Sequence, residues 1–139
     1  KKGAKATSKL IYAFANATVP KVNLIVEDAI GSAYIAMNSK ATGADVVYAW
    51  PTAKVGMMDA ASAVKIMYAD EIESGDATEV IAEKTAEYQN LQGSVMSAAA
   101  RGYVDSIVEP VDTRKYIIGA FEMLYTKFED RPGKKHGTV

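Results

Sequence analysis

Three small residues, Gly31, Ser32 and Ala33, lie between an apolar segment and the start of a helical pattern. When a strand passes into a helix through small residues, the first backbone N–H groups of the helix find no acceptor within it. Such groups can hold an anion, or an oxygen that becomes negative during a reaction. The pattern predicts an anion or oxyanion site built from main-chain donors. The simpler alternative is that Gly31 serves only the backbone geometry of the turn.

Side chains that could act as nucleophile, base or metal ligand are scarce. The one histidine, His136, lies in a polar tail between Lys135 and Gly137 and is typical of a solvated residue. Ser32 could be a nucleophile, but no candidate base lies near it in the sequence. There is no cysteine, and no GxGxxG, HxxxH, CxxC or GxSxG motif. We therefore expect main-chain chemistry and no bound metal ion.

The composition is that of a globular chain with balanced charge. Of 139 residues, 49% are hydrophobic, and 16 basic residues against 17 acidic ones give a net charge of −1. This balance argues against a nucleic-acid partner or an anionic membrane surface. No apolar run suggests a signal peptide or a membrane span. The absence of cysteine excludes a disulfide framework and is compatible with a reducing compartment.

Apolar residues alternate between helical and strand spacing along the chain. We expect strands over residues 22–26, 46–50, 54–57 and 103–108. We expect helices over 4–17, 32–38, a buried 60–69 capped by Asp59, a surface helix from the capping box at 76–79 to Leu91, 94–101, and 113–128. The last helix should face the core with Ile117, Ile118, Phe121, Leu124 and Tyr125. The tail 131–139 should be exposed or docked on a partner.

Strands separated by helices predict an α/β fold with parallel pairing. The predicted strands are few and short for the number of helices that must cover them. This imbalance indicates a partial domain whose remainder lies upstream of Lys1.

A set of short motifs occurs in order along the whole chain. They are the segments 17–21 (ATVPK), 31–34 (GSAY), 43–45 (GAD), 49–53 (AWPTA), 99–105 (AARGYVD), 109–110 (EP), 113–114 (TR) and 134–137 (KKHG). Together they resemble the carboxyltransferase subunit of biotin-dependent acyl-CoA carboxylases, of the propionyl-CoA carboxylase beta type. The resemblance implies a crotonase-like (ClpP/crotonase) α/β fold, with residues 1–139 forming the later part of the subunit's C-terminal domain.

The resemblance also implies a reaction and a site. A carboxyl group would move between carboxybiotin and the α-carbon of a short acyl-CoA, with a biotin nitrogen as the base. The backbone of Gly31, Ser32 and Ala33 would form an oxyanion hole for the biotin carbonyl, and Tyr34 and Ile35 would bind substrate. An apolar residue at position 35, where propionyl-selective members have Asp, suggests a wider acyl range.

The partners implied by the resemblance are acyl-CoA, a biotin carboxyl carrier protein, a biotin carboxylase and further copies of the subunit, with a hexamer expected. Biotin would be carried on a separate protein or domain. The location would be cytoplasmic, in a bacterium rather than in a mitochondrial matrix.

The sequence also departs from the family pattern. Ser32 replaces a usual Gly, and Glu27 and Asp28 stand where an Arg-Lys pair is common, which should disfavour an anionic neighbour. Three alternatives stay open: a biotin-dependent malonyl-type CoA decarboxylase subunit, another crotonase-superfamily hydratase or isomerase, and a non-catalytic oligomerisation domain.

Overall fold

The computed structural model describes residues 2–133 of the chain. Its α-helices are α1 (Lys2–Asn16), α2 (Gly31–Ala36), α3 (Ala60–Met67), α4 (Ala69–Ser74), α5 (Ala77–Leu91), α6 (Val95–Ala100) and α7 (Thr113–Met123). The strands are β1 (Val22–Ile25), β2 (Asp28–Ile30), β3 (Val46–Ala49), β4 (Lys54–Gly56) and β5 (Ser106–Ile107), and short 3₁₀ turns occupy η1 (Lys40–Thr42) and η2 (Pro110–Asp112).

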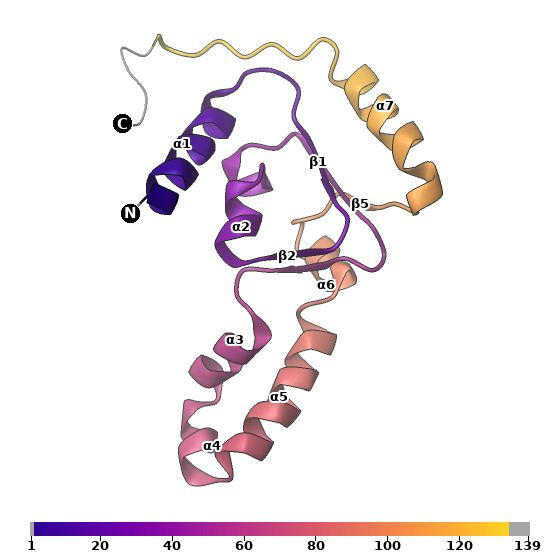
Figure 1. Cartoon of the computed structure of the whole chain (residues 1–139). Helices are drawn as coiled ribbons and strands as arrows, with labels where there is room; N and C mark the ends of the chain where they lie inside the picture. The colour runs from indigo at the N-terminus through magenta and orange to yellow at the C-terminus, as the bar shows by residue number, and fades with distance from the viewer. Residues whose placement is uncertain (1, 134–139) are drawn as a thin grey trace.

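The strands form two small parallel sheets. One has the order β1-β3-β5 and the other pairs β2 with β4. In Figure 1, β2 runs across the direction of β1, so the chain changes sheet between the two strands. The predicted α/β class with parallel pairing is confirmed. Strand β2 was not predicted. It has three residues, too few to show the alternating spacing of a strand, and it follows the exposed residues Val26 and Glu27.

The core lies between the sheets and the helices α2 and α6. Its central residues are small or β-branched, which allows close approach of the backbone segments. The main cluster comprises Ile25, Tyr34, Ala44, Val47, Ala49, Ala53, Val55, Val95, Ala98 and Val104. A second cluster beneath α7 consists of Tyr48, Val108 and Ala120.

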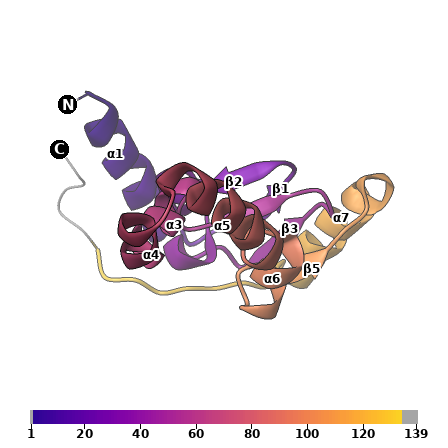
Figure 2. The ribbon, with the colours of Figure 1, turned by 90° about the horizontal axis from the view of Figure 1, so that it is seen from below.

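Helices α3, α4 and α5 form an arm that projects from the body, as Figure 1 shows. In Figure 2, which is seen from below, these helices lie in front of the body. The predicted N-caps are confirmed: the Asp59 carboxylate accepts from the Ser62 N–H, and the Asp76 carboxylate accepts from the Thr78 and Glu79 N–H groups. The helix predicted over residues 60–69 forms as α3, but it is buried on one side only, at Ala63 and Val64. Ile66 and Met67 are 68% and 61% exposed. The reason is that α3 packs mainly against α5 and α4 of the arm, which leaves its other side exposed.

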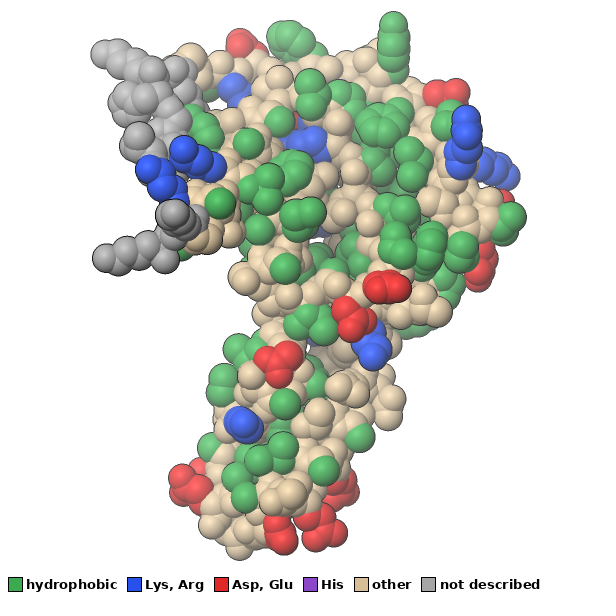
Figure 3. Space-filling model, in the orientation of Figure 1, with side chains coloured by type: hydrophobic (Ala, Val, Ile, Leu, Met, Phe, Trp, Pro, Cys, Tyr) green, Lys and Arg blue, Asp and Glu red, His purple; other side chains and the backbone are tan. Residues whose placement is uncertain are grey.

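Helix α7 is shorter than predicted and turns a narrower face inward. It ends at Met123 rather than near Phe128, and Ala120 is its buried residue. Phe121 and Tyr125, which were predicted to face the core, are 45% and 88% exposed. Figure 3 shows hydrophobic side chains gathered over this helix.

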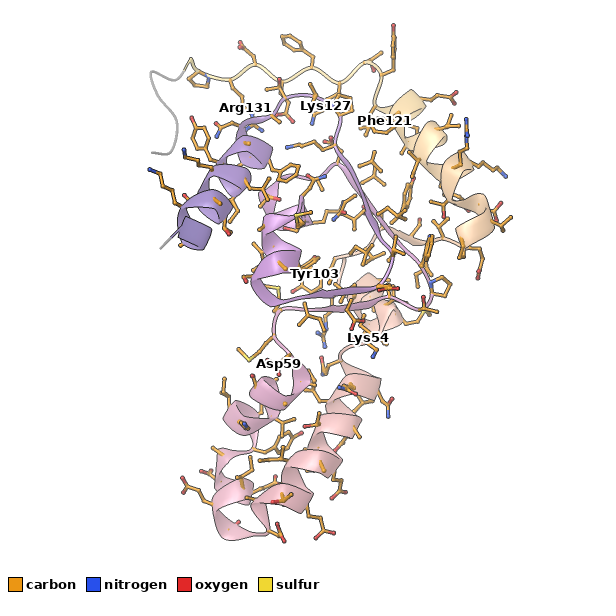
Figure 4. All side chains as sticks on the ribbon, viewed as in Figure 1. Lys54, Asp59, Tyr103, Phe121, Lys127 and Arg131 are labelled. Carbon is orange, nitrogen blue, oxygen red and sulfur yellow. The ribbon has the colours of Figure 1, made fainter. Side chains whose placement is uncertain are left out.

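Beyond α7 a turn at residues 124–126 leads into residues 127–133, which cross the body without helix or strand and which we call the strap. The Lys127 Nζ lies 2.9 Å from Asp45 Oδ2 and 3.1 Å from Glu129 Oε1. Arg131 donates to the carbonyl of Ala15 at the end of α1. Figure 4 shows Lys127 and Arg131 turned toward α1 and the start of β1. These contacts hold the segment beyond α7 against the end of α1 and the start of β1. His136 and the rest of the tail beyond residue 133 lie outside the described residues.

Candidate functional site

The predicted strand-to-helix turn is present at the start of α2. Ile30 is extended, with φ −125° and ψ 139°, and Gly31 has a φ of +69°. This left-handed conformation suits glycine, because any Cβ at that φ meets the backbone. No side chain caps the helix, and Ser32 and Ala33 are exposed. The first N–H groups of α2 are therefore open to a ligand from outside the chain.

The turn is held in place by the second sheet. Ile30 pairs with Gly56 at the end of the β2–β4 ladder. The carbonyl oxygen of Met57, the next residue, lies 3.9 Å from the position that a Cβ on Gly31 would take. The segment after β4 thus passes directly over the start of α2. Space for a methyl group exists there, so the requirement for glycine comes from its φ and not from crowding.

The two predicted substrate-binding residues lie differently. Tyr34 is buried, and its ring meets the ring of Tyr103 edge to face, with centroids 6.5 Å apart. Burial raises the pKa of the Tyr34 hydroxyl, and Tyr103 raises it further. Ile35 is half-buried against the main core cluster and does not line either cavity beside α2. Its contact with substrate stays a prediction.

A cleft of about 260 Å³ lies where the arm joins the body, and we call it the neck cleft. Figure 4 shows Lys54, Asp59 and Tyr103 around this junction. Its walls come from β2, α2, β4, the β4–α3 connection, the start of α3, α5 and α6. They include Ile30, Tyr34, Val55, Gly56, Met57, Met58, Ala60, Ala61, Thr85, Tyr88, Gln89, Gln92, Ala98 and Arg101. The Thr85 hydroxyl oxygen is buried and has no hydrogen-bond partner among the described residues.

A second hollow of about 250 Å³ lies on the other side of Tyr34. We call it the side cleft, and it is lined by residues 23–29, Ala33, Tyr34 and Met37. Tyr34 and Asp28 line both cavities. The first turn of α2 therefore lies between two spaces that could each receive part of a ligand.

The acidic pair that departs from the family pattern lies beside these cavities. Glu27 and Asp28 are exposed and line the side cleft. Asp28 is the register partner of Lys54 across β2 and β4, so opposite charges face each other along this edge. Asp59 also lines the neck cleft, but its carboxylate is engaged by Ser62, whose hydrogen bonds lower the Asp59 pKa. Asp59 therefore acts as a helix cap, and it is poorly suited to accept a proton near neutral pH.

Several lining residues were not found by sequence reasoning. Met57 was assigned to a strand end or to the core, and Thr85, Gln89 and Gln92 fall on the polar side of the surface helix. Only the packing of α5 beside β4 brings them together, and no spacing in the sequence signals that. Within residues 2–133, no helix is both long and apolar enough to cross a bilayer, and no group of three acidic, histidine or cysteine side chains could hold a metal ion.

Comparison with known proteins identifies the family. The model of the family described as "Carboxyl transferase domain" matches residues 3–139, so the chain belongs to that family. A Bacillus subtilis (strain 168) protein named for the propionyl-CoA carboxylase beta chain is 50% identical over 133 residues, covering 95% of this chain and 26% of its own length.

Solved structures agree with this assignment. The crystal structure of transcarboxylase 12S, titled for its hexamer assembly and for bound methylmalonyl-coenzyme A and methylmalonic acid, is 43% identical with a TM-score of 0.88 over 96% of this chain and 26% of that one. The beta subunit of P. aeruginosa geranyl-CoA carboxylase is 29% identical with a TM-score of 0.72 over the same shares. The fold is thus the crotonase-like one expected from the sequence. The chain spans about a quarter of the length of these relatives.

Proposed function

We propose that this chain is the later part of the C-terminal domain of an acyl-CoA carboxyltransferase subunit that works with biotin. The observation that carries the proposal is the uncapped start of α2, with Gly31 at positive φ and Ser32 and Ala33 exposed. The family membership of residues 3–139 supports the reaction class. Of the carboxylates that line the neck cleft, Asp59 is engaged by Ser62 and Asp28 lies opposite Lys54 in the strand register, which fits a reaction in which the substrate pair provides its own base.

The backbone N–H groups of Ser32 and Ala33 would hold the carbonyl oxygen of the biotin ring. The start of α2 fits such a group, because Ser32 and Ala33 are exposed and no side chain within residues 2–133 caps the helix. When bound, carboxybiotin supplies the carboxyl group that is transferred. The role of the chain is to hold the ring and to stabilise negative charge on its oxygen. Loss of one such preorganised donor costs about 2.7–4 kcal/mol in a comparable hole.

The remaining assignments extend the proposal to the whole subunit. The acyl-CoA would lie beside Tyr34, and a biotin carboxyl carrier protein and a biotin carboxylase would deliver the carboxyl group. The subunit would assemble as a homo-oligomer, with a hexamer as the expected form, since the related transcarboxylase 12S is described as a hexamer. We place it in the bacterial cytoplasm.

The experiment compares three variants of the complete subunit in a carboxyl-transfer assay with biotin and propionyl-CoA. Ser32→Ala should keep most of the activity, because the backbone donor survives. Ala33→Pro, which deletes the donor, should lower kcat by about 10²–10³. An α-hydroxy acid in place of Ala33 replaces the N–H by an ester oxygen without adding a ring, and it should lower kcat by a similar factor.

Near-UV circular dichroism and thermal melting check that each variant folds. An equal loss of kcat in Ser32→Ala and in the ester variant would point to a serine nucleophile instead of an oxyanion hole formed by the backbone. Full activity in the ester variant would overturn the assignment of Ala33.

A further inference from the structure

The neck cleft is apolar inside and charged at its mouth. Tyr34, Val55 and Ala98 are buried, and Ile30 and Ala60 are half-buried. The charged lining residues are all exposed: Asp28, Lys54, Asp59 and Arg101. Mostly apolar walls with a charged rim favour a largely aliphatic ligand part, and the buried Thr85 hydroxyl adds a polar contact in the wall.

The cleft begins next to the proposed oxyanion turn. Ile30 and Tyr34, which both line it, flank the segment Gly31–Ala33 on either side. The Met57 carbonyl passes over Gly31, and Met57 and Met58 continue into the lining. A substrate whose reacting carbon lies at the start of α2 could therefore extend its far end into this cleft.

The size of the cleft sets the kind of ligand part. A cavity of about 150 Å³ holds a benzene ring, so about 260 Å³ has room for about six carbons or more. It is below the range of about 300–1,000 Å³ that encloses a drug-sized molecule, so a whole coenzyme A does not fit. The flexible thioethers of Met57 and Met58 suit a chain of variable shape, because methionine adapts to irregular contacts.

We infer that the neck cleft binds the aliphatic chain of acyl-CoA substrates longer than propionyl, linear or branched, of about six to eight carbons. This inference rests on the proposed carboxyltransferase function and adds its substrate class. Each methylene buried in the cleft should then improve kcat/KM about fourfold, until the cleft is full.

The test measures kcat/KM of the complete subunit for propionyl-, butyryl-, hexanoyl- and octanoyl-CoA. Ala61→Phe narrows the cleft, since Ala61 lines it on α3. The matched control is Ala86→Phe, an alanine of α5 that does not line the cleft. We expect Ala61→Phe to lower the hexanoyl-to-propionyl ratio of kcat/KM at least tenfold. Ala86→Phe should leave the ratio unchanged.

Calorimetric titration of wild type and both variants with propionyl- and hexanoyl-CoA gives a second readout that needs no turnover. Hexanoyl-CoA should bind wild type at least tenfold more tightly than propionyl-CoA, and Ala61→Phe should remove this advantage. Met58→Ala, which widens the cleft, gives the opposite test and should shift the preference toward octanoyl-CoA.

A wild type that neither turns over nor binds hexanoyl-CoA better than propionyl-CoA would overturn the inference and leave the proposed function standing. A hexanoyl-to-propionyl ratio of kcat/KM that is equal in Ala61→Phe and Ala86→Phe would also overturn the inference and leave the proposed function standing. No transfer with any acyl-CoA would overturn the proposed function, and the titrations would still decide whether the cleft binds acyl chains.

Discussion

Tyr103 fixes the residue that directly follows the proposed oxyanion turn: its ring meets that of Tyr34 edge to face at an interplanar angle of 74°. Tyr103 comes from the segment between α6 and β5, and Tyr34 from the first turn of α2. The contact therefore joins a short helix to a distant part of the chain. A T-shaped pair contributes about 0.5–1.5 kcal/mol beyond the area that it buries.

We expect Tyr103→Leu to lower the free energy of unfolding by about 1–2 kcal/mol, the ring contact plus part of the apolar burial. Tyr103→Phe keeps the ring and should lie within about 0.5 kcal/mol of wild type. Urea unfolding followed by circular dichroism measures both. If the two substitutions cost the same, the hydroxyl of Tyr103 matters and the ring contact does not.

The Tyr34 hydroxyl predicts a loss of stability in alkali. Burial, and then Tyr103, raise the pKa of Tyr34 above its ordinary value, so the folded state favours the neutral phenol. The stabilisation from the neutral phenol is complete below about pH 10, the pKa of a tyrosine in the unfolded chain. It is lost as the pH rises through the higher pKa that Tyr34 has in the folded state. Wild type should therefore lose more stability than Tyr34→Phe between about pH 9 and pH 11. Urea unfolding of both proteins across this pH range measures the difference. If the free energy of unfolding falls equally with pH in wild type and Tyr34→Phe, the prediction is contradicted.

Gly31 and Gly119 should respond to alanine with opposite signs. Gly31 has a φ of +69°, so Gly31→Ala should cost about 1–2 kcal/mol of strain although no atom blocks the methyl group. Gly119 lies inside α7, and no atom outside the helix backbone comes within 4 Å of the place that a methyl group would take, so alanine there should add about 0.5–1 kcal/mol. Thermal and urea unfolding of both variants give the signs. Stabilisation by Gly31→Ala would mean that the turn does not keep its positive φ.

Local signals in the sequence were sufficient to predict the start of α2 and the N-caps of the arm helices α3 and α5. Asp59 and Asp76 accept hydrogen bonds from N–H groups two or three residues later, so the neighbouring sequence is enough to predict their role as helix caps. The small residues at 31–33 likewise report a turn that involves only their own backbone. These features depend on short-range geometry, which a single sequence carries.

Features that depend on distant partners could not be predicted in this way. The spacing in α3 shows which of its faces is apolar but not whether anything covers that face. The course of the strap depends on the contact of Lys127 with Asp45, 82 positions earlier in the chain. The neck cleft requires α5 beside β4, and the isolated bridge between Lys54 and Ser94 is the contact that joins the end of the arm to the sheet.

Asp45 anchors the strap and predicts a loss of stability in acid. Burial alone would raise the pKa of its carboxyl, but hydrogen bonds from Lys127 Nζ at 2.9 Å and from the Lys21 N–H at 2.7 Å outweigh it and lower the pKa. The stabilisation from the ionised Asp45 carboxylate is therefore complete above about pH 4, the pKa of an aspartate in the unfolded chain. It is lost as the pH falls through the lower pKa that Asp45 has in the folded state.

Asp45→Asn should cost about 1–3 kcal/mol at about pH 7, and the difference from wild type should shrink by about pH 3. The control is Asp130→Asn, an exposed carboxylate on the same strap, which should change the free energy of unfolding by less than about 0.5 kcal/mol. Urea unfolding at both pH values measures the differences. A cost in acid as large as that at neutral pH would show that the ionised carboxylate is not what holds the strap.

Ile35 allows a test that separates packing from specificity. It packs half-buried against the core cluster, so Ile35→Asp should lower the free energy of unfolding by at least about 1–3 kcal/mol through a poorly solvated carboxylate. If position 35 also borders the acyl group, Ile35→Asp should narrow the preference among acetyl-, propionyl- and butyryl-CoA toward propionyl-CoA. Ile35→Asn is the matched control, since it is polar and similar in size to Asp without its charge. The same ratio in all three proteins would remove Ile35 from the site.

The exposed side of α7 should make the 139-residue chain associate with itself. Ile118, Phe121 and Tyr125 are 48%, 45% and 88% exposed and border one shallow surface hollow. Contiguous apolar side chains of this kind are covered in stable proteins, either by another part of the fold or by a partner. Sedimentation velocity should show a larger mean mass as concentration rises. The double variant Phe121→Ser/Tyr125→Ser should reduce that rise, whereas Leu91→Ser, at an exposed position on α5, should not. A chain that stays monomeric over the whole concentration range would contradict this prediction.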